Sequence, residues 1–327
     1  MHADHPLDAR IDPPPSQTAV AGWPPRDRPS AGDRERSLVD VDPRAFAEAF
    51  GRRSLFVGHR LSDHPLLTLE AIAELADRLT PESVRRESGR LPFVDTRGYV
   101  DVGQGPPSQT IRDIERNGFR VSLRDIHQVP EYADVIHRCL DEVQALVGDR
   151  EGGLVHRAGY LFISSPAATT PMHFDVEHSF LLQVRGTKNV HVAAFDDDLD
   201  SLERERIRYF AGEPCDFAAM QAVADSFSIH AGLGVYLPSY VPHWVDTKAG
   251  VSISFSIPFY TAFCRRAQTV YRVNRRMRKL HLSPRPPGAS PTADRTKEAL
   301  SRSVSVLRAA RRGSAAQAPA APTEPSP

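Results

Sequence analysis

Thr-Pro-Met-His-Phe-Asp, residues 170–175, is the stretch that decides the fold of this chain. It places His173 and Asp175 two residues apart in an extended segment. Because side chains repeat every two residues along a strand, both point to the same face. An imidazole and a carboxylate on one face supply half of a site for a divalent metal.

The second half of such a site is predicted at His243, within Tyr-Val-Pro-His-Trp-Val (residues 240–245), just after an apolar strand predicted at 235–237. Two histidines and one carboxylate form the facial triad of non-heme Fe(II) oxygenases, which leaves coordination positions open. His243 follows His173 by 70 residues. A ligand so distant can close the site in a small β-barrel, whose strands pair non-locally.

These residues resemble the cupin-like JmjC oxygenases, which depend on Fe(II) and 2-oxoglutarate and include the asparaginyl hydroxylase of the hypoxia pathway. The resemblance runs from about residue 160 to 258 and is most specific in residues 170–175 and 186–188. It implies that iron is held by three side chains: His173, Asp175 and His243.

The resemblance also implies a site for the cosubstrate. Lys188, fifteen residues after His173, matches the lysine that pairs with the distal carboxylate of 2-oxoglutarate, and Thr170 matches a threonine that hydrogen-bonds the same group. Two positions depart from better-known members: Ser179 where many carry Asn, and Ser256 where a longer polar residue occurs. Neither departure removes a metal ligand, so both put cosubstrate affinity in doubt rather than the reaction class.

Tyr160 and three predicted strands add to the expected site. The Tyr160 hydroxyl is a candidate to bind a cosubstrate carboxylate, and plain packing of its ring is the alternative. Residues 251–257 alternate, with serines that include Ser256 on one face, which we expect to line a wet cavity. Residues 179–184 and 188–194 flank a turn and predict a β-hairpin that brings Lys188 to the barrel mouth. A buried ammonium there needs an anion, whereas a surface lysine beside the turn does not.

Composition excludes several classes of protein. The 327 residues carry a formal net charge of zero, so no general attraction to nucleic acid or an anionic membrane is expected. Three widely spaced cysteines, Cys139, Cys215 and Cys264, suggest neither a disulfide framework nor a structural zinc site. The chain has no apolar segment typical of a signal peptide or a membrane span, and we expect a cytoplasmic protein.

The chain divides into four predicted parts. Residues 1–38 are a disordered lead, 39–260 a cupin-like JmjC barrel with a helical N-terminal part, 261–282 a C-terminal helix, and 283–327 a mostly disordered tail with one helix at 296–312. Helices around the barrel are predicted at 68–79, capped by Thr68, at 108–116, and from Pro130. Residues 196–221 predict a solvated helix start rather than a calcium loop.

The C-terminal helix has a basic face and an apolar stripe of Val270, Val273, Met277 and Leu280. The basic face suits contact with nucleic acid or an acidic peptide, and a solvated face is the alternative. The apolar stripe suits a homodimer seam, as the resemblance suggests, or packing on the chain's own barrel.

The expected fold is therefore mainly β with flanking helices, a double-stranded β-helix of the cupin or jelly-roll type with disordered ends. The expected function is an Fe(II)- and 2-oxoglutarate-dependent dioxygenase that uses O2 to hydroxylate a protein side chain, RNA or a small metabolite. Two alternatives stay open: a non-catalytic barrel that senses a metal or small acid, and a different metal chemistry such as isomerisation on Mn or Zn.

Overall fold

The structure is a computed structural model that describes residues 37–90, 101–193, 220–221 and 224–301. The chain forms two compact units, residues 1–264 and 265–327. The first contains the barrel and the second most of the C-terminal helix. The structures predicted for residues 1–36, 196–219 and 302–327 lie outside the described residues.

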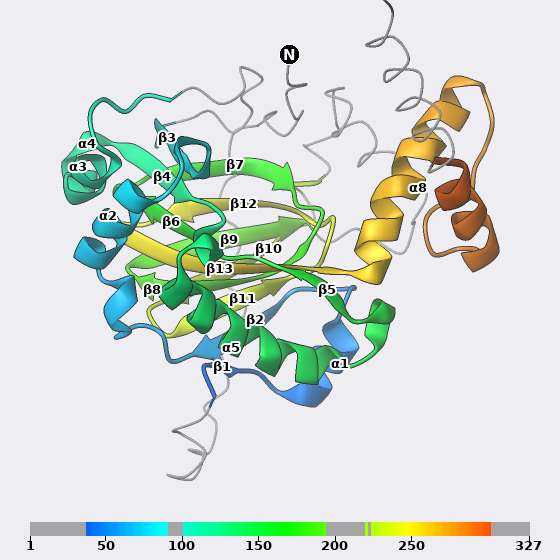
Figure 1. Cartoon of the computed structure of the whole chain (residues 1–327), viewed down its shortest axis with the longest axis horizontal. Coiled ribbons are helices and arrows are strands. Elements are labelled where there is room, and N and C mark those ends of the chain that lie inside the picture. Colours follow the sequence, from blue (N-terminus) through cyan, green and yellow to red (C-terminus); the bar gives the residue numbers. More distant parts are fainter. Residues whose placement is uncertain (1–36, 91–100, 194–219, 222–223, 302–327) are drawn as a thin grey trace, which may run out of the picture. The chain divides into compact units, whose positions relative to one another are not determined.

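Two antiparallel sheets build the first unit (Figure 1). The larger has the strand order β1-β2-β11-β8-β13-β6-β4-β3, with β5 paired to β13, and the smaller the order β10-β9-β12-β7. The larger sheet comprises β1 (Val39–Asp40), β2 (Leu55–His59), β3 (Val84–Ser88), β4 (Phe119–Leu123), β5 (Leu154–Arg157), β6 (Tyr160–Ser164), β8 (His178–Arg185), β11 (Leu233–Leu237) and β13 (Ser252–Thr261). The smaller comprises β7 (Thr169–Phe174), β9 (Thr187–Ala193), β10 (Ala224–His230) and β12 (Pro242–Thr247).

Strands β6, β7, β8 and β9 lie alternately in the two sheets, and so do β10, β11, β12 and β13, which confirms the predicted jelly roll. The predicted hairpin between β8 and β9 is wrong, because β8 pairs with β11 and β13 while β9 pairs with β10 and β12. The turn at Gly186 instead carries the chain from one sheet to the other. Gly186 has φ +76°, and a Cβ on it would lie 2.4 Å from the Val251 carbonyl oxygen, so this crossing needs glycine.

The two faces of the larger sheet bury different side chains. Between the sheets lies an apolar cluster that includes Leu181, Val190 and Val235, whereas the outer face packs against helices through residues such as Phe180 and Phe255. The alternation predicted for residues 251–257 is therefore confirmed. Its serine face only partly lines the cavity, because Gln183 hydrogen-bonds the hydroxyls of Ser252 and Ser254, both fully buried, and Ser256 alone of the three reaches the cavity.

Helices cover the outer face of the larger sheet (Figure 1). Thr68 caps α2 by accepting a hydrogen bond from the Ala71 amide, as predicted. The single helix expected at 108–116 is two, because the backbone leaves helical geometry at Asp113 before Gly118 ends the second one at φ +68°. The helices are α1 (Pro43–Ala49), α2 (Leu69–Arg78), α3 (Pro107–Arg112), α4 (Ile114–Asn117) and α5 (Pro130–Val147), with 3-10 turns η1 (Pro65–Leu67), η2 (Pro81–Ser83), η3 (Ile126–Gln128) and η4 (Arg150–Gly152).

The C-terminal helix α8 spans Ala262–Lys279, and residues 291–301 are also helical, five residues ahead of the helix predicted there. Within residues 265–301, Lys297 Nζ and Asn274 Nδ2 both donate to the Arg285 carbonyl oxygen. Val270 and Val273 are buried in the chain, whereas Leu280 is 72% exposed. The dimer seam proposed for this stripe stays a prediction. In the part of the chain that the structure describes, no helix has the length and apolarity to cross a membrane.

Candidate active site

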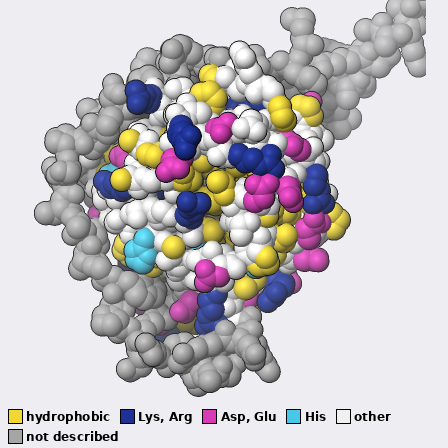
Figure 2. Space-filling view, turned by 90° about the vertical axis from the view of Figure 1, so that its left-hand side faces the viewer, with side chains coloured by type: hydrophobic (Ala, Val, Ile, Leu, Met, Phe, Trp, Pro, Cys, Tyr) yellow, Lys and Arg dark blue, Asp and Glu magenta, His cyan; other side chains and the backbone are white. Residues whose placement is uncertain are grey.

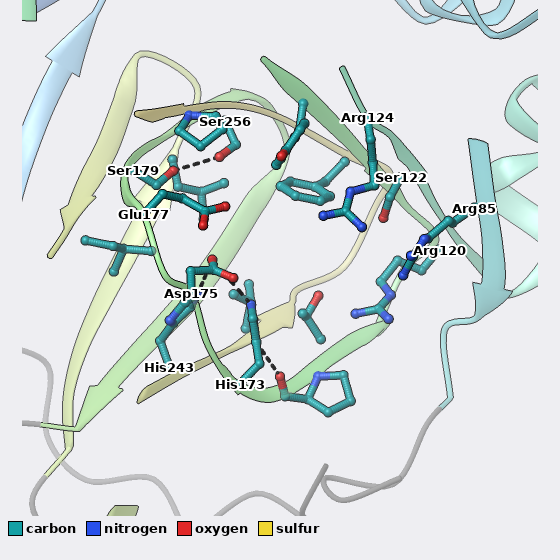
Figure 3. A pocket seen from close by; sticks show the side chains of 18 of the residues that line it. Arg85, Arg120, Ser122, Arg124, His173, Asp175, Glu177, Ser179, His243 and Ser256 are labelled. Carbon is teal, nitrogen blue, oxygen red and sulfur yellow. Dashed lines mark hydrogen bonds and ion pairs between the residues drawn. The ribbon is translucent and has the colours of Figure 1, made fainter. Parts of the chain in front are cut away.

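The three predicted metal ligands meet between the two sheets. His173 on β7 and His243 on β12 are Cα partners in the smaller sheet, and Asp175 follows directly after β7. Asp175 Oδ2 lies 3.8 Å from His173 Nε2 and 3.6 Å from His243 Nε2. One donor atom from each residue lies within 4.8 Å of the others, so the structure brings His243 to the pair of His173 and Asp175, although it follows His173 by 70 residues (Figure 3).

Both imidazoles are held with one nitrogen turned toward Asp175. His173 Nδ1 lies 2.8 Å from the Pro171 carbonyl oxygen and His243 Nδ1 lies 3.0 Å from that of Val241. A carbonyl only accepts, so each Nδ1 carries the proton and donates it, and each Nε2 keeps its lone pair. Metal-binding histidines are commonly oriented in this way. Burial and the neighbouring His243 lower the pKa of His173 to about 4, against the opposing effect of Asp175, so this ring is neutral at neutral pH.

A cavity of about 170 Å³ contains the trio and every predicted cosubstrate residue. Thr170, Lys188, Tyr160, Ser256 and Ser179 all line it. Thr170 lies within β7, which begins at Thr169. Ser179 and Ser256 hydrogen-bond each other at 2.8 Å across β8 and β13. The structure thus brings the predicted residues together, while their roles stay predictions.

Lys188 is a buried lysine in the wall of this cavity. It lies on β9 and is only 3% exposed, and its ammonium group has no hydrogen bond or ion pair with the residues that the structure describes. Burial, assisted by the nearby charge of Arg120, lowers its pKa to about 7. Forcing an ammonium group out of water in this way is unfavourable unless an anion pairs with it. The alternative of a surface lysine beside a turn is therefore wrong.

Five charged side chains in the cavity wall were missed from the sequence. Arg120 on β4 and Glu87 on β3 form an ion pair of 2.6 Å, each side chain 8% exposed. The Arg124 guanidinium carbon lies 5.2 Å from the centre of the Tyr160 ring. Figure 3 shows Arg85 and Arg120 on one side of the trio and Glu177 on the other. The residues missed are Arg85, Glu87, Arg120, Arg124 and Glu177.

Glu177 and Tyr160 line the same cavity, and the pKa of each is raised above its ordinary value. Burial and the neighbouring Asp175 raise the pKa of Glu177 to about 7, although Tyr260 Oη donates a hydrogen bond of 3.1 Å to its carboxylate. Burial, with the charge of Glu177, raises the pKa of Tyr160 to about 12. Tyr160 therefore stays protonated at neutral pH and offers a hydroxyl donor to the cavity.

The sequence of the chain matches the family model of the JmjC domain over residues 151–265. These residues are a JmjC domain. The prediction of a domain of the JmjC oxygenase class is confirmed, and the matched segment contains all three members of the metal trio together with Lys188 and Thr170. A comparison of the chain with curated proteins finds no match.

Solved structures with a related shape include the ribosomal oxygenase YcfD from Escherichia coli. Its complex with cobalt and 2-oxoglutarate has a TM-score of 0.45 and 14% identity over 80% of this chain and 66% of that one. Its complex with cobalt and succinic acid has a TM-score of 0.43 and 13% identity over 81% and 66%. The present chain thus spans about two thirds of the length of YcfD.

Proposed function

We propose that the chain is an Fe(II)- and 2-oxoglutarate-dependent oxygenase that hydroxylates its substrate. The observation that supports this most is the sharing of one cavity by the trio His173, Asp175 and His243 and by the buried Lys188. A metal site alone suits many chemistries. A buried ammonium beside it suits an acidic cosubstrate in particular, because its desolvation is otherwise uncompensated.

The trio fits iron by its chemistry. Two neutral imidazoles and one carboxylate are the donors of the facial triad, and the hydrogen bonds from Nδ1 of His173 and His243 orient both rings. When bound, iron would supply the activation of O2 and the oxidative decarboxylation of 2-oxoglutarate that hydroxylation requires. The protein's own part is to bind, orient and exclude water around that centre.

Lys188 and Thr170 are the proposed partners of the distal cosubstrate carboxylate. Lys188 lies on β9 and Thr170 on β7, and both line the cavity together with the trio. A charge-assisted hydrogen bond from the ammonium and a neutral one from the hydroxyl would hold the acid. Tyr160 and Ser256 line the same cavity, and we propose their hydroxyls as further hydrogen-bonding groups for the cosubstrate.

The remaining polar wall is proposed to face the substrate. Arg124 and Glu177 provide opposite charges there, and the Arg124 guanidinium lies over the Tyr160 ring. The outer surface gives no such guide, since acidic and basic side chains are interspersed over the face shown in Figure 2. The proposed substrate is a protein side chain, RNA or a small metabolite. Cys139 and Cys264 are free thiols, which supports a reducing compartment such as the cytosol.

A direct assay separates this proposal from a non-catalytic metal-binding barrel. The purified chain is incubated with Fe(II), O2 and 2-oxoglutarate without substrate, and succinate is measured by mass. An oxygenase of this class is expected to form succinate slowly, and His243→Ala should abolish the formation. Equal succinate from the wild type and His243→Ala, or none from a wild type that contains iron, would contradict the proposal. A screen of peptides, RNA and metabolites for a gain of one oxygen atom then identifies the substrate.

A further inference from the structure

A second group of potential metal ligands lies away from the cavity, on the outer side of the larger sheet. It consists of Glu151 in η4, His178 at the start of β8 and Cys264 in the first turn of α8. One donor atom from each lies within 4.8 Å of the others. Side chains alternate along a strand, so His178 points to the face opposite its neighbour Ser179, which lines the cavity. The group is therefore separate from the proposed active site.

The contacts within this group are short and converge on its centre. His178 Nε2 lies 3.1 Å from Glu151 Oε2. Thr261 Oγ1 donates to Glu151 Oε2 at 2.7 Å and lies 2.8 Å from Cys264 Sγ, while the Thr261 amide donates to the same sulfur at 3.0 Å. The donors of a tetrahedral zinc ion lie roughly 3.3 to 3.7 Å apart, so small adjustments would bring sulfur, nitrogen and oxygen to that spacing.

The surroundings shield two members of the group from water, whereas the Glu151 side chain is 21% exposed. His178 and Cys264 are fully buried, and the imidazole stacks between Phe50 and Phe259 with ring centroids at 4.9 and 5.3 Å. Tyr236 Oη lies 2.8 Å from His178 Nδ1, a position from which it can fix the ring as outer hydrogen-bonding partners of metal-bound histidines do. The Ser239 amide faces the same nitrogen at 3.3 Å.

Glu151 reaches this position at a cost in backbone energy. It adopts φ +53°, in the left-handed region that a residue with a Cβ seldom occupies because of steric strain. Gly51 makes room for its carboxylate, since a Cβ on that glycine would lie 2.8 Å from Glu151 Oε1. Nothing in the proposed oxygenase function uses Glu151, His178 or Cys264, so the strained placement needs another explanation.

We propose that Glu151, His178 and Cys264 bind a structural divalent ion of the zinc class, separate from the iron site. Thiolate, imidazole and carboxylate together suit zinc, and water or Thr261 completes the coordination. The ion would tie η4, β8 and the start of α8 together.

Cobalt(II) tests the proposal, because cobalt bound to a thiolate absorbs in the near ultraviolet through charge transfer from sulfur. The proposed iron site contains no sulfur, so the band reports the second site alone. Metal-free full-length protein is titrated with Co(II) under anaerobic conditions. We expect two cobalt ions per chain, the thiolate band, and loss of that band when Zn(II) is added.

Variants assign the band to its ligands. Cys264→Ser should abolish it and leave one cobalt per chain, whereas the matched Cys139→Ser and Cys215→Ser should retain it. Serine can still hydrogen-bond Thr261, so Cys264→Ser is expected to fold, which circular dichroism checks. Glu151→Gln should weaken cobalt binding at this site at least about tenfold. His173→Ala should lose the other cobalt but keep the band, so failure of the iron proposal is distinguishable from failure of this one.

Two results would overturn the second site. A wild type that binds cobalt without any thiolate band shows that the group is only a buried hydrogen-bonded ion pair. A band that survives in Cys264→Ser but disappears in Cys139→Ser or Cys215→Ser assigns the sulfur elsewhere.

Discussion

His243 and His173 face each other as Cα partners on β12 and β7, with ring centroids 4.1 Å apart. Register sets this relationship, because a shift of one residue in either strand would turn one ring to the opposite face of the sheet. The pairing of β12 with β7 shifts register just after His243, so the local geometry is specific to this position. Two imidazoles and Asp175 thereby reach one point from strands distant in sequence.

The first prediction concerns these ligands. His173→Ala and His243→Ala should each weaken divalent-metal binding at the trio at least about a hundredfold, since each removes one of only three protein donors. Titration with Mn(II) followed by calorimetry measures the effect. The matched control is His230→Ala, an exposed histidine at the end of β10, which should bind as the wild type does. Normal affinity in either trio variant would reject the assignment of that ligand.

The second prediction concerns the crossing between the sheets. Gly186→Ala should lower the free energy of unfolding by about 3 kcal/mol or more, because its Cβ would lie 2.4 Å from a backbone oxygen in addition to the strain of φ +76°. Gly118→Ala shares the strain at φ +68° but has open space around the new Cβ, and should cost only about 1 kcal/mol. Equal losses in urea unfolding would mean that no close contact exists at Gly186.

Much of the barrel was predictable because its signals are local. Alternation marked the strands, Thr68 marked the start of α2, and the residues of the trio and Lys188 sit at spacings that the JmjC resemblance specifies. The hairpin was wrong for a physical reason. Two alternating segments joined by a glycine turn look alike whether they pair with each other or cross between sheets, since pairing partners such as β12 lie far along the chain.

The charged cavity wall was missed for a related reason. Arg120 alternates with apolar neighbours along β4, and such a polar position usually faces water. Here it faces a cavity closed by β7 and β9, which begin 49 and 67 residues later. The group of Glu151, His178 and Cys264 was likewise hidden, because its members share no sequence spacing. Only the topology brings them together.

The third prediction concerns the buried pair of Glu87 and Arg120. Glu87→Gln should lower the free energy of unfolding by about 3 to 5 kcal/mol, because it removes the carboxylate that balances a guanidinium only 8% exposed. The matched control is Glu70→Gln. Glu70 pairs with Arg112 on the surface, where both side chains are over 40% exposed and water screens their charges, so its loss should lower the free energy of unfolding far less. Denaturant unfolding of both variants gives the comparison, and similar costs would contradict the prediction.

The fourth prediction concerns stability and pH in the metal-free protein. The pKa of Lys188 is about 7 in the folded state and 10.5 when unperturbed, so between these values the unfolded chain binds more protons than the folded one. The free energy of unfolding should therefore rise with pH across this window, by at most about 1.4 kcal/mol per pH unit for this group. Lys188→Met should lack this contribution, which the difference between the two proteins at pH 6.5 and pH 9 isolates. An identical pH dependence in both would contradict a depressed pKa.

The last prediction concerns the binding of 2-oxoglutarate, measured by calorimetry with Mn(II) in place of iron. A charge-assisted pair in a partly dry cavity is worth about 2 to 4 kcal/mol, so Lys188→Met should weaken binding by about thirty- to a thousandfold while metal binding persists. Above pH 7 the free protein holds Lys188 mostly neutral, and binding must take up a proton to form the pair. Wild-type affinity should then fall by up to about tenfold per pH unit between pH 7.5 and pH 9. Lys248→Met, at a lysine just beyond β12 and outside the cavity wall, should keep both the affinity and this slope. If Lys188→Met binds as tightly as the wild type, or shows the same slope, the anion is bound elsewhere and the proposed cosubstrate site is wrong.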